Sequence, residues 1–236
     1  MPGGDVRVVS AEAVRGALEA VAPQFTRDTG IAVSFAFMTA GQVRERVEAH
    51  DAADLAIASN TVIAALVKSG VASRPVDLGR IGLAVATRAG AAAPDLATPE
   101  AFVAALRAAR SISFTDPAAG GTAGIYVAGL LQRLGIADEV LRKAVFSNGG
   151  RDAAAKAASG EAELAITFPS EIVPVAGASV AGPLPEELQS YTIYAAAIPA
   201  AAAASDAAAR YLAALTAPAA RMHWRSAGFE PLNEVA

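Results

Sequence analysis

The stretch Ser111–Gly135, SISFTDPAAGGTAGIYVAGLLQRLG, predicts a strand, a glycine turn and a helix in immediate succession. Ser111–Thr115 is a short strand, Asp116–Thr122 is a turn with two adjacent glycines, and apolar residues then recur at helical spacing. The first turn of a helix has unpaired N–H groups and the positive end of the dipole, so this junction suits an anion. The lysine of a nucleotide-binding loop is missing after the glycines. A plain turn with a hydroxyl cap is the alternative interpretation.

The same order of strand, small hydroxyl residue and helix occurs three times near the N-terminus. The expected strands and the hydroxyl residues after them are Asp5–Val9 with Ser10, Ile31–Met38 with Thr39, and Asp54–Ala58 with Ser59. Strands separated by single helices indicate βαβ units and a mostly parallel sheet. The carboxyl ends of such strands border the ligand crevice. We therefore expect three hydroxyls along one edge, although each could simply cap the next helix, as Ser10 is placed to do.

A second alternation of helices and strands is expected between residues 98 and 170. It begins with Thr98-Pro99-Glu100, which has the hydroxyl, proline and acid typical of a helix start. Ile81–Thr87 is predicted to form one strand, residues 174–189 to be rich in loops, and Tyr191–Ile198 to form a strand that returns to the first unit. The predicted lobes are residues 1–86 with 191–236, and residues 87–190.

Composition excludes several classes of function. The chain has 236 residues, a net charge of −4 with interleaved signs, two histidines and no cysteine. No run is long and apolar enough for a membrane span, and the charge pattern argues against nucleic-acid binding. Thiol chemistry and thiolate metal sites are excluded. We expect no metal and no cofactor, and neither histidine is placed for a Ser–His–Asp arrangement.

Three charged residues are candidates for the binding site. Arg151 follows a glycine pair at a predicted helix start, where a cation opposes the helix dipole, so it is a candidate for holding an anion. Pairing with a nearby acid on the surface is the alternative. Arg80 is a second candidate, with a surface position as its alternative. Asp116 is the carboxylate of the glycine turn; it is a candidate general base, but bonding to the following backbone N–H groups is the expected role.

With these residues assembled, the chain resembles the molybdate-binding-protein-like periplasmic solute-binding proteins, a family that also includes aconitate isomerase-like proteins. The resemblance covers nearly the whole chain. It is carried by VVSAEAVRGALEAVAPQFTRDTG, FAFMTAGQVRERV, DLAIASN, FTDPAAGGTAG, GEAELAIT and the ending SAGFEPL. It implies an α/β fold of the two-lobed type II kind, with mostly parallel sheets, helices on both faces, and an anion held in a cleft between the lobes.

The resemblance also implies which residues contact the anion. Together with the candidates above, the expected ligand-binding residues are Ser10, Ala11, Thr39, Ala40, Ser59, Arg80, Gly121, Thr122, Arg151 and Ser170. The chain departs from true molybdate binders at Thr39-Ala40, where they usually have two serines, and at Phe168-Pro169, where they usually have a tyrosine. These departures, and the charge of Arg151, favour an organic acid or another oxyanion.

The expected function is therefore capture of a small anion, either a molybdate-like oxyanion or a di- or tricarboxylate, by a monomeric binding protein. An ABC-type transporter is a candidate partner, and no nucleic acid or membrane insertion is expected. The alternative is an aconitate isomerase-like enzyme acting on a tricarboxylate, with Asp116 as its base. The resemblance implies a periplasmic location, with a signal peptide absent or already removed; a native start at Met1 would imply the cytoplasm.

Overall fold

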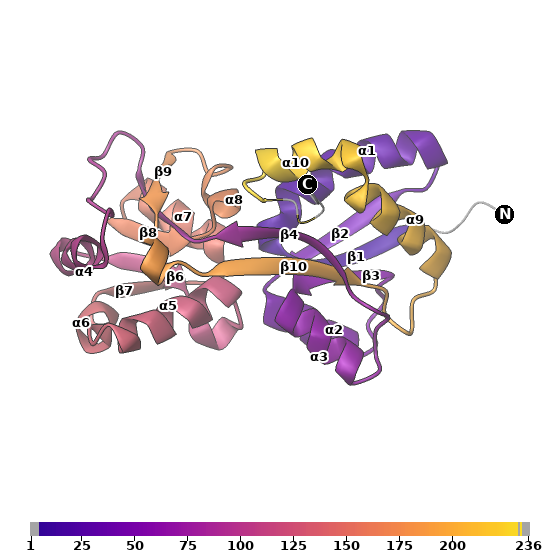
Figure 1. Ribbon diagram of the computed structural model, residues 1–236, viewed down its shortest axis with the longest axis horizontal. Helices are drawn as coiled ribbons and strands as arrows, with labels where there is room; N and C mark the ends of the chain where they lie inside the picture. Colours follow the sequence, from indigo (N-terminus) through magenta and orange to yellow (C-terminus); the bar gives the residue numbers. More distant parts are fainter. Residues whose placement is uncertain (1–4, 231, 233–236) are drawn as a thin grey trace. The chain divides into compact units, whose positions relative to one another are not determined.

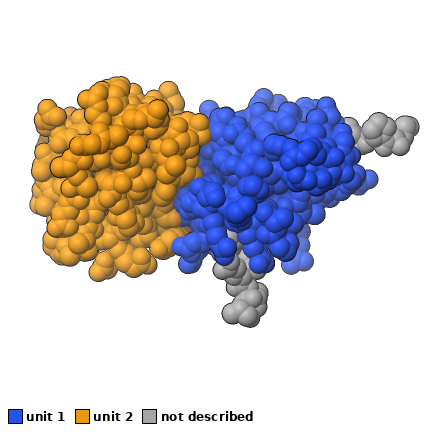
Figure 2. Space-filling model, turned by 90° about the horizontal axis from the view of Figure 1, so that it is seen from above, with its two compact units in different colours: residues 1–81, 192–236 blue, residues 82–191 orange. Residues whose placement is uncertain are grey.

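The computed structural model describes residues 5–230 and 232 and divides into two compact units. Figure 2 distinguishes unit 1, formed by residues 1–81 and 192–236, from unit 2, formed by residues 82–191. The possible native start at Met1, and Pro231 within the SAGFEPL ending, lie outside the described residues. Each unit contains one five-stranded sheet with helices on both faces, so the predicted α/β fold is confirmed.

The sheet of unit 1 has the strand order β2-β1-β3-β10-β4. Its strands are β1 (Val6–Ala11), β2 (Val33–Met38), β3 (Leu55–Ser59), β4 (Val76–Gly82) and β10 (Tyr191–Ala197). Strand β1 runs parallel to both β2 and β3, whereas β10 is antiparallel to β3. The three strands predicted near the N-terminus are therefore neighbours in a parallel sheet, and the C-terminal strand does return to this unit.

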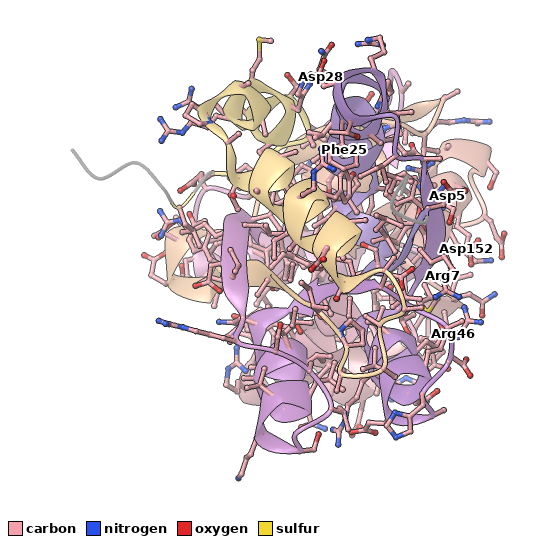
Figure 3. All side chains as sticks on the ribbon, turned by 90° about the vertical axis from the view of Figure 1, so that its right-hand side faces the viewer. Asp5, Arg7, Phe25, Asp28, Arg46 and Asp152 are labelled. Carbon is pink, nitrogen blue, oxygen red and sulfur yellow. The ribbon has the colours of Figure 1, made fainter. Side chains whose placement is uncertain are left out.

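Helices cover both faces of this sheet (Figure 1). One face carries α1 (Arg15–Thr29), α9 (Ser205–Thr216) and α10 (Arg221–Ser226), while α2 (Ala40–Glu48) and α3 (Asn60–Lys68) cover the other. Short 3₁₀ turns, Glu12–Val14 and Pro218–Ala220, precede α1 and α10. Phe25 of α1, labelled in Figure 3, packs edge-on against Tyr211 of α9. The two ring centroids are 5.1 Å apart.

The sheet of unit 2 has the order β7-β6-β8-β5-β9 and repeats the arrangement of the first. Its strands are β5 (Ala84–Arg88), β6 (Ile112–Thr115), β7 (Ala144–Ser147), β8 (Leu164–Thr167) and β9 (Ala178–Pro183). The central β6 is parallel to β7 and β8, and β5 is antiparallel to β8 and β9. In each unit, three parallel strands thus end side by side at one edge.

Helices again cover both faces of the sheet of unit 2 (Figure 1). They are α4 (Pro99–Ala108), α5 (Thr122–Arg133) and α6 (Ala137–Leu141) on one side, and α7 (Gly150–Ser159) and α8 (Pro169–Ile172) on the other. The predicted start of α4 is confirmed, since the Thr98 hydroxyl accepts a hydrogen bond from the Ala101 N–H at 3.2 Å. Two further 3₁₀ turns span Pro117–Ala119 and Glu186–Leu188.

The structure corrects three predictions about single elements. Ile81–Thr87 does not form one strand: β4 ends at Gly82 in unit 1's sheet and β5 begins at Ala84 in unit 2's sheet. The loop-rich residues 174–189 also contain a strand that was not predicted, because β9 pairs there with β5 despite its glycine and proline. Ser10 is not a helix cap; β1 extends through it to Ala11, which precedes the 3₁₀ turn.

At the amino edge of the unit 1 sheet, an ion pair between the half-exposed Arg7 and the buried Asp54 joins β1 to the residue before β3. The Arg7 guanidinium binds both oxygens of the fully buried Asp54, with Nε to Oδ2 at 2.9 Å and Nη2 to Oδ1 at 3.1 Å. The backbone N–H of Ala204 donates to Asp54 Oδ1 at 3.0 Å. Figure 3 labels Arg7. These bonds hold β1, the start of β3 and the chain before α9 together. They lie at the amino edge of the sheet, whereas the predicted hydroxyls lie at its carboxyl edge.

No helix within residues 5–230 combines the length and the apolar character needed to cross a membrane.

Candidate functional site

Unit 1 brings its three predicted hydroxyl residues to one edge of the sheet. Ser10 and Ala11 end the central strand β1, with Ala11 aligned to Met38 of β2 and Ser10 to Ile57 of β3. Thr39 directly follows β2, and Ser59 is the last residue of β3. The parallel direction of the strands is what gathers these side chains, as the sequence pattern predicts. Their role in binding stays a prediction.

The three hydroxyls differ in their own bonding. The buried Ser10 Oγ donates to the Ala11 carbonyl at 3.1 Å. Thr39 is a true cap of α2: its Oγ1 accepts from Gln42 N at 3.3 Å, and Gln42 Oε1 accepts from Thr39 N at 3.0 Å. Ser59 holds the cap position of α3, yet its Oγ lies 3.2 Å from Thr61 Oγ1 rather than on a backbone N–H. Ala40 is the buried first residue of α2.

In unit 2 the glycine turn follows the central strand β6. Asp116 Oδ1 accepts a hydrogen bond from the Ala118 N–H at 2.9 Å, which confirms its expected part in the turn. Gly121 stands at the cap position of α5 without a side chain to fill it, and the half-buried Thr122 is the first helical residue. The backbone N–H groups in the first turn of α5 therefore lie near the carboxyl end of β6.

The neighbouring strand β7 leads into the start of α7. Ser147 Oγ donates to the Gly149 carbonyl at 3.0 Å, and Asp152 accepts from Asn148 N at 3.0 Å. These bonds shape the turn that places Gly150 and the half-buried Arg151 in the first turn of α7. Arg151 thus lies at the same sheet edge as the glycine turn, as expected from the sequence.

The third parallel strand, β8, ends in a compact polar group. Thr167 Oγ1 donates to Glu171 Oε2 at 2.5 Å, and both side chains are buried. Ser170 is only 9% exposed, and its Oγ has no hydrogen-bond partner. Sequence reasoning selected Ser170 but missed Glu171. The signal was available, since Glu171 is an acid in the first turn of a short helix that directly follows a strand.

Within unit 1, the structure keeps Arg80 apart from the three hydroxyl candidates. It lies on β4, which β10 separates from β3 in the sheet. Its Nε and Nη2 bind Glu230 Oε2 at 2.7 and 2.6 Å, and the two backbones form an antiparallel bridge. Arg80 is exposed. Arg80 therefore has the surface position that the sequence analysis gave as its alternative.

No group of three His, Asp or Glu side chains within the described part of the chain gathers closely enough to hold a metal ion.

Gly150 offers a first test of the packing at this edge. An alanine Cβ there would lie 1.9 Å from Glu171 Oε2 and 2.0 Å from Thr167 Oγ1. We expect Gly150→Ala to displace the buried carboxylate and to lower the free energy of unfolding by about 2 kcal/mol, which urea denaturation would measure. Gly149→Ala is the matched control, because its Cβ would meet nothing within 4 Å. Equal stability of the two variants would contradict the expected packing.

The family model for the bacterial extracellular solute-binding proteins matches residues 6–230. The chain belongs to this family. A curated relative of this solute-binding protein is the aconitate isomerase of a Pseudomonas species, 28% identical over 201 residues, which are 82% of this chain and 75% of the relative. The resemblance stated from the sequence, to solute-binding proteins and to aconitate isomerase-like proteins, is confirmed.

Solved structures share the fold of this solute-binding protein at low sequence identity. The periplasmic molybdate-binding protein of Azotobacter vinelandii superimposes with a TM-score of 0.79 at 22% identity, over 96% of this chain and 99% of that one. The sulfate-binding protein SubI of Mycobacterium tuberculosis gives a TM-score of 0.81 at 17% identity, over 98% and 88%. These likenesses establish the fold of the chain.

Proposed function

We propose that this protein captures one small anion, an inorganic oxyanion or an organic carboxylate. The observation that carries the proposal is the placement of hydroxyls and helix N-termini at the carboxyl edge of the parallel strands in each unit. Backbone N–H groups, hydroxyls and Arg151 are the donor set that suits an anion. Family membership supports the proposal, because the family consists of solute-binding proteins.

The cellular setting belongs to the same proposal. We propose a periplasmic, monomeric protein that delivers its anion to an ABC-type transporter. Among the solved structures of this fold, one is described as the substrate-binding domain of a molybdenum ABC transporter from Clostridium difficile. Delivery requires release of an unchanged ligand, so the protein need not alter its anion chemically.

Anion binding is tested by thermal unfolding and calorimetry against molybdate, sulfate, phosphate, citrate and the aconitates. A ligand at about a hundred times its Kd stabilises the folded state by about 2.7 kcal/mol, which is several degrees for a chain of this size. We expect at least one anion of this panel to give such a shift. A full panel without a shift or a heat of binding would contradict the proposed function.

Ser170→Ala separates binding from folding. Because the Ser170 hydroxyl is buried without a partner, its removal costs no hydrogen bond and should leave thermal stability unchanged or slightly higher. Affinity for the anion should fall about tenfold. Ser113→Ala is the control, since the Ser113 hydroxyl is also buried and unpartnered but belongs to the interior of β6. Equal affinities of the two variants would argue against a ligand contact at Ser170.

An isomerase is the second candidate function, supported by the curated relative. Moving a double bond in aconitate needs a base within reach of the substrate carbon. Asp116 remains the proposed base: its Oδ1 accepts the hydrogen bond from Ala118 N, and its Oδ2 would take the proton from the substrate carbon. Incubating the protein with cis-aconitate and following ultraviolet absorbance tests this function; a change that Asp116→Asn abolishes would favour the enzyme over the binding protein.

A further inference from the structure

A cavity within unit 2 is not used by the proposed function. Its volume is about 520 Å³, which is in the range of small-molecule sites. Residues 94–97, the segment before α4, contribute part of its lining, and residues within 181–191, which include the end of β9, contribute the rest. All of them belong to unit 2. Among the described residues that line this cavity, none is a proposed anion contact.

The charged side chains of this cavity are acidic. Asp95 and Glu186 line it from the two segments, and among the described lining residues there is no lysine, arginine or histidine. Asp95 Oδ1 accepts a hydrogen bond from Ala97 N at 3.0 Å, which ties this carboxylate to its own segment. Glu186 Oε2 lies 3.5 Å from the Tyr191 hydroxyl. Two carboxylates at one cavity favour a positively charged ligand over an anion.

Apolar groups form much of the remaining wall. They come from Leu96, Leu184 and three prolines, and Tyr191 lines the cavity with them. Tyr191 is 43% exposed, so a ligand can reach its side chain. An aromatic face attracts a cation, and a planar guanidinium stacks on it readily. The Gln189 amide is already bonded to the Leu83 backbone N–H and carbonyl, at 2.7 and 3.0 Å, so it supports the wall.

The donor set distinguishes between two kinds of cation. A calcium ion takes about six to eight oxygen ligands, and a magnesium ion requires octahedral coordination. Within residues 5–230, no three His, Asp or Glu side chains gather closely enough to hold a metal ion. A guanidinium instead forms bidentate hydrogen bonds with carboxylates, and the carbon chain that carries it packs on apolar groups. Two carboxylates beside leucines and a tyrosine fit the organic cation.

We propose that this cavity is a binding site for a small organic cation that carries a guanidinium group. The guanidinium pairs with Asp95 and Glu186, while the Tyr191 ring and the two leucines contact the rest of the molecule. The proposal goes beyond anion capture, because it assigns a second ligand, of opposite charge, to a separate cavity of unit 2.

The test compares agmatine with N-carbamoylputrescine, in which a neutral urea group replaces the guanidinium. Both are titrated into the full chain by calorimetry at neutral pH and low salt. We expect agmatine to bind saturably with a Kd of about 1 mM or lower, and the urea analogue to bind about tenfold more weakly. Agmatine that fails to saturate the protein, or equal affinities for the two compounds, would overturn the proposal.

Charge-removing variants then locate the site. Asp95→Asn and Glu186→Gln keep the size of each side chain, and both residues are exposed, so each should weaken agmatine binding by about threefold and the pair by about tenfold. Glu187→Gln is the matched control: Glu187 is exposed beside Glu186 but is not among the described residues that line the cavity. It should keep the wild-type Kd. Equal weakening by Glu186→Gln and Glu187→Gln would show attraction by net charge alone and overturn the site.

A guanidinium can also come from an arginine of another protein, and a peptide distinguishes this source. A blocked peptide with one arginine between alanines should bind more weakly than agmatine, because the cavity has the volume of a small molecule. Tighter binding of the peptide would overturn the assignment to a small cation. The anion panel and this titration use different ligands, so failure of the proposed function and failure of this inference are distinguishable.

Discussion

Replacing Gly124 by alanine should destabilise the protein by about 3 kcal/mol, because helix α5 packs against the backbone at the end of β6. An alanine Cβ at this position would lie 2.0 Å from the Thr115 carbonyl oxygen and 2.8 Å from its carbonyl carbon. Neither atom belongs to a flexible side chain, so the helix or the strand would have to move. Chemical denaturation monitored by circular dichroism would measure the loss.

The same helix provides the matched control. Gly129 lies in α5 as well, but its added Cβ would meet only Arg133 Nη1, at 3.6 Å. Gly129→Ala should therefore be neutral or stabilising by up to about 1 kcal/mol, the usual helix preference for alanine over glycine. A Gly124→Ala variant as stable as Gly129→Ala would show that the contact between α5 and Thr115 is looser than described.

Gly124→Ala should also weaken anion binding more than its effect on stability explains. The glycine turn that ends at Gly121 connects Thr115 to the start of α5. Moving the helix away from the strand would shift the first N–H groups of α5, which are proposed donors. Calorimetry on the folded fraction of the variant would measure this second effect.

Replacing Asp54 by asparagine should cost about 3 kcal/mol of stability. Asp54 is fully buried and accepts hydrogen bonds from the Arg7 side chain, the Arg7 backbone N–H at 3.0 Å and the Ala204 N–H at 3.0 Å. An amide presents one acceptor oxygen instead of two, so part of this set of donors would be left unsatisfied at a fully buried position. Denaturation midpoints at neutral pH would measure the loss.

The same carboxylate predicts how stability depends on pH. Burial by itself raises the pKa of Asp54, but hydrogen bonds from the Arg7 side chain and backbone and from Ala204 N outweigh it and lower the pKa from 3.8 to about 2. The unfolded chain therefore takes up a proton at a higher pH than the folded one. About 2 kcal/mol of stability is present above pH ~4 and is lost as the pH falls toward ~2.

Asp51→Asn is the control for both measurements on Asp54. Asp51 is also paired with an arginine, Arg46, at 3.0 Å, but both side chains are 46% exposed. Figure 3 labels Arg46. An exposed pair of this kind contributes less than about 1 kcal/mol. If Asp54→Asn kept the wild-type loss of stability between pH ~4 and ~2, the carboxylate of Asp54 would not be its source.

Local patterns predicted most of the fold because each depends on neighbours in sequence. The strand, hydroxyl and helix order around Ser10, Thr39 and Ser59 predicted three parallel strands with their carboxyl ends at one edge, and the sheet has this arrangement. The start of α4 was predicted equally well, from the hydroxyl of Thr98 and the proline at position 99. Strand β9 was missed because its glycine and proline are local signals for a turn, whereas its pairing with β5 comes from a distant segment.

The candidate site shows the same division at the level of single side chains. The sequence by itself determined which hydroxyls, glycines and helix starts follow each strand, because strand direction and helix spacing order these residues along the chain. Only the tertiary structure decided that Arg80 binds Glu230, that Ser170 is buried without a partner, and that the Glu171 carboxylate lies against Gly150. Burial and charge pairing are set by segments far apart in sequence, and no local pattern encodes them.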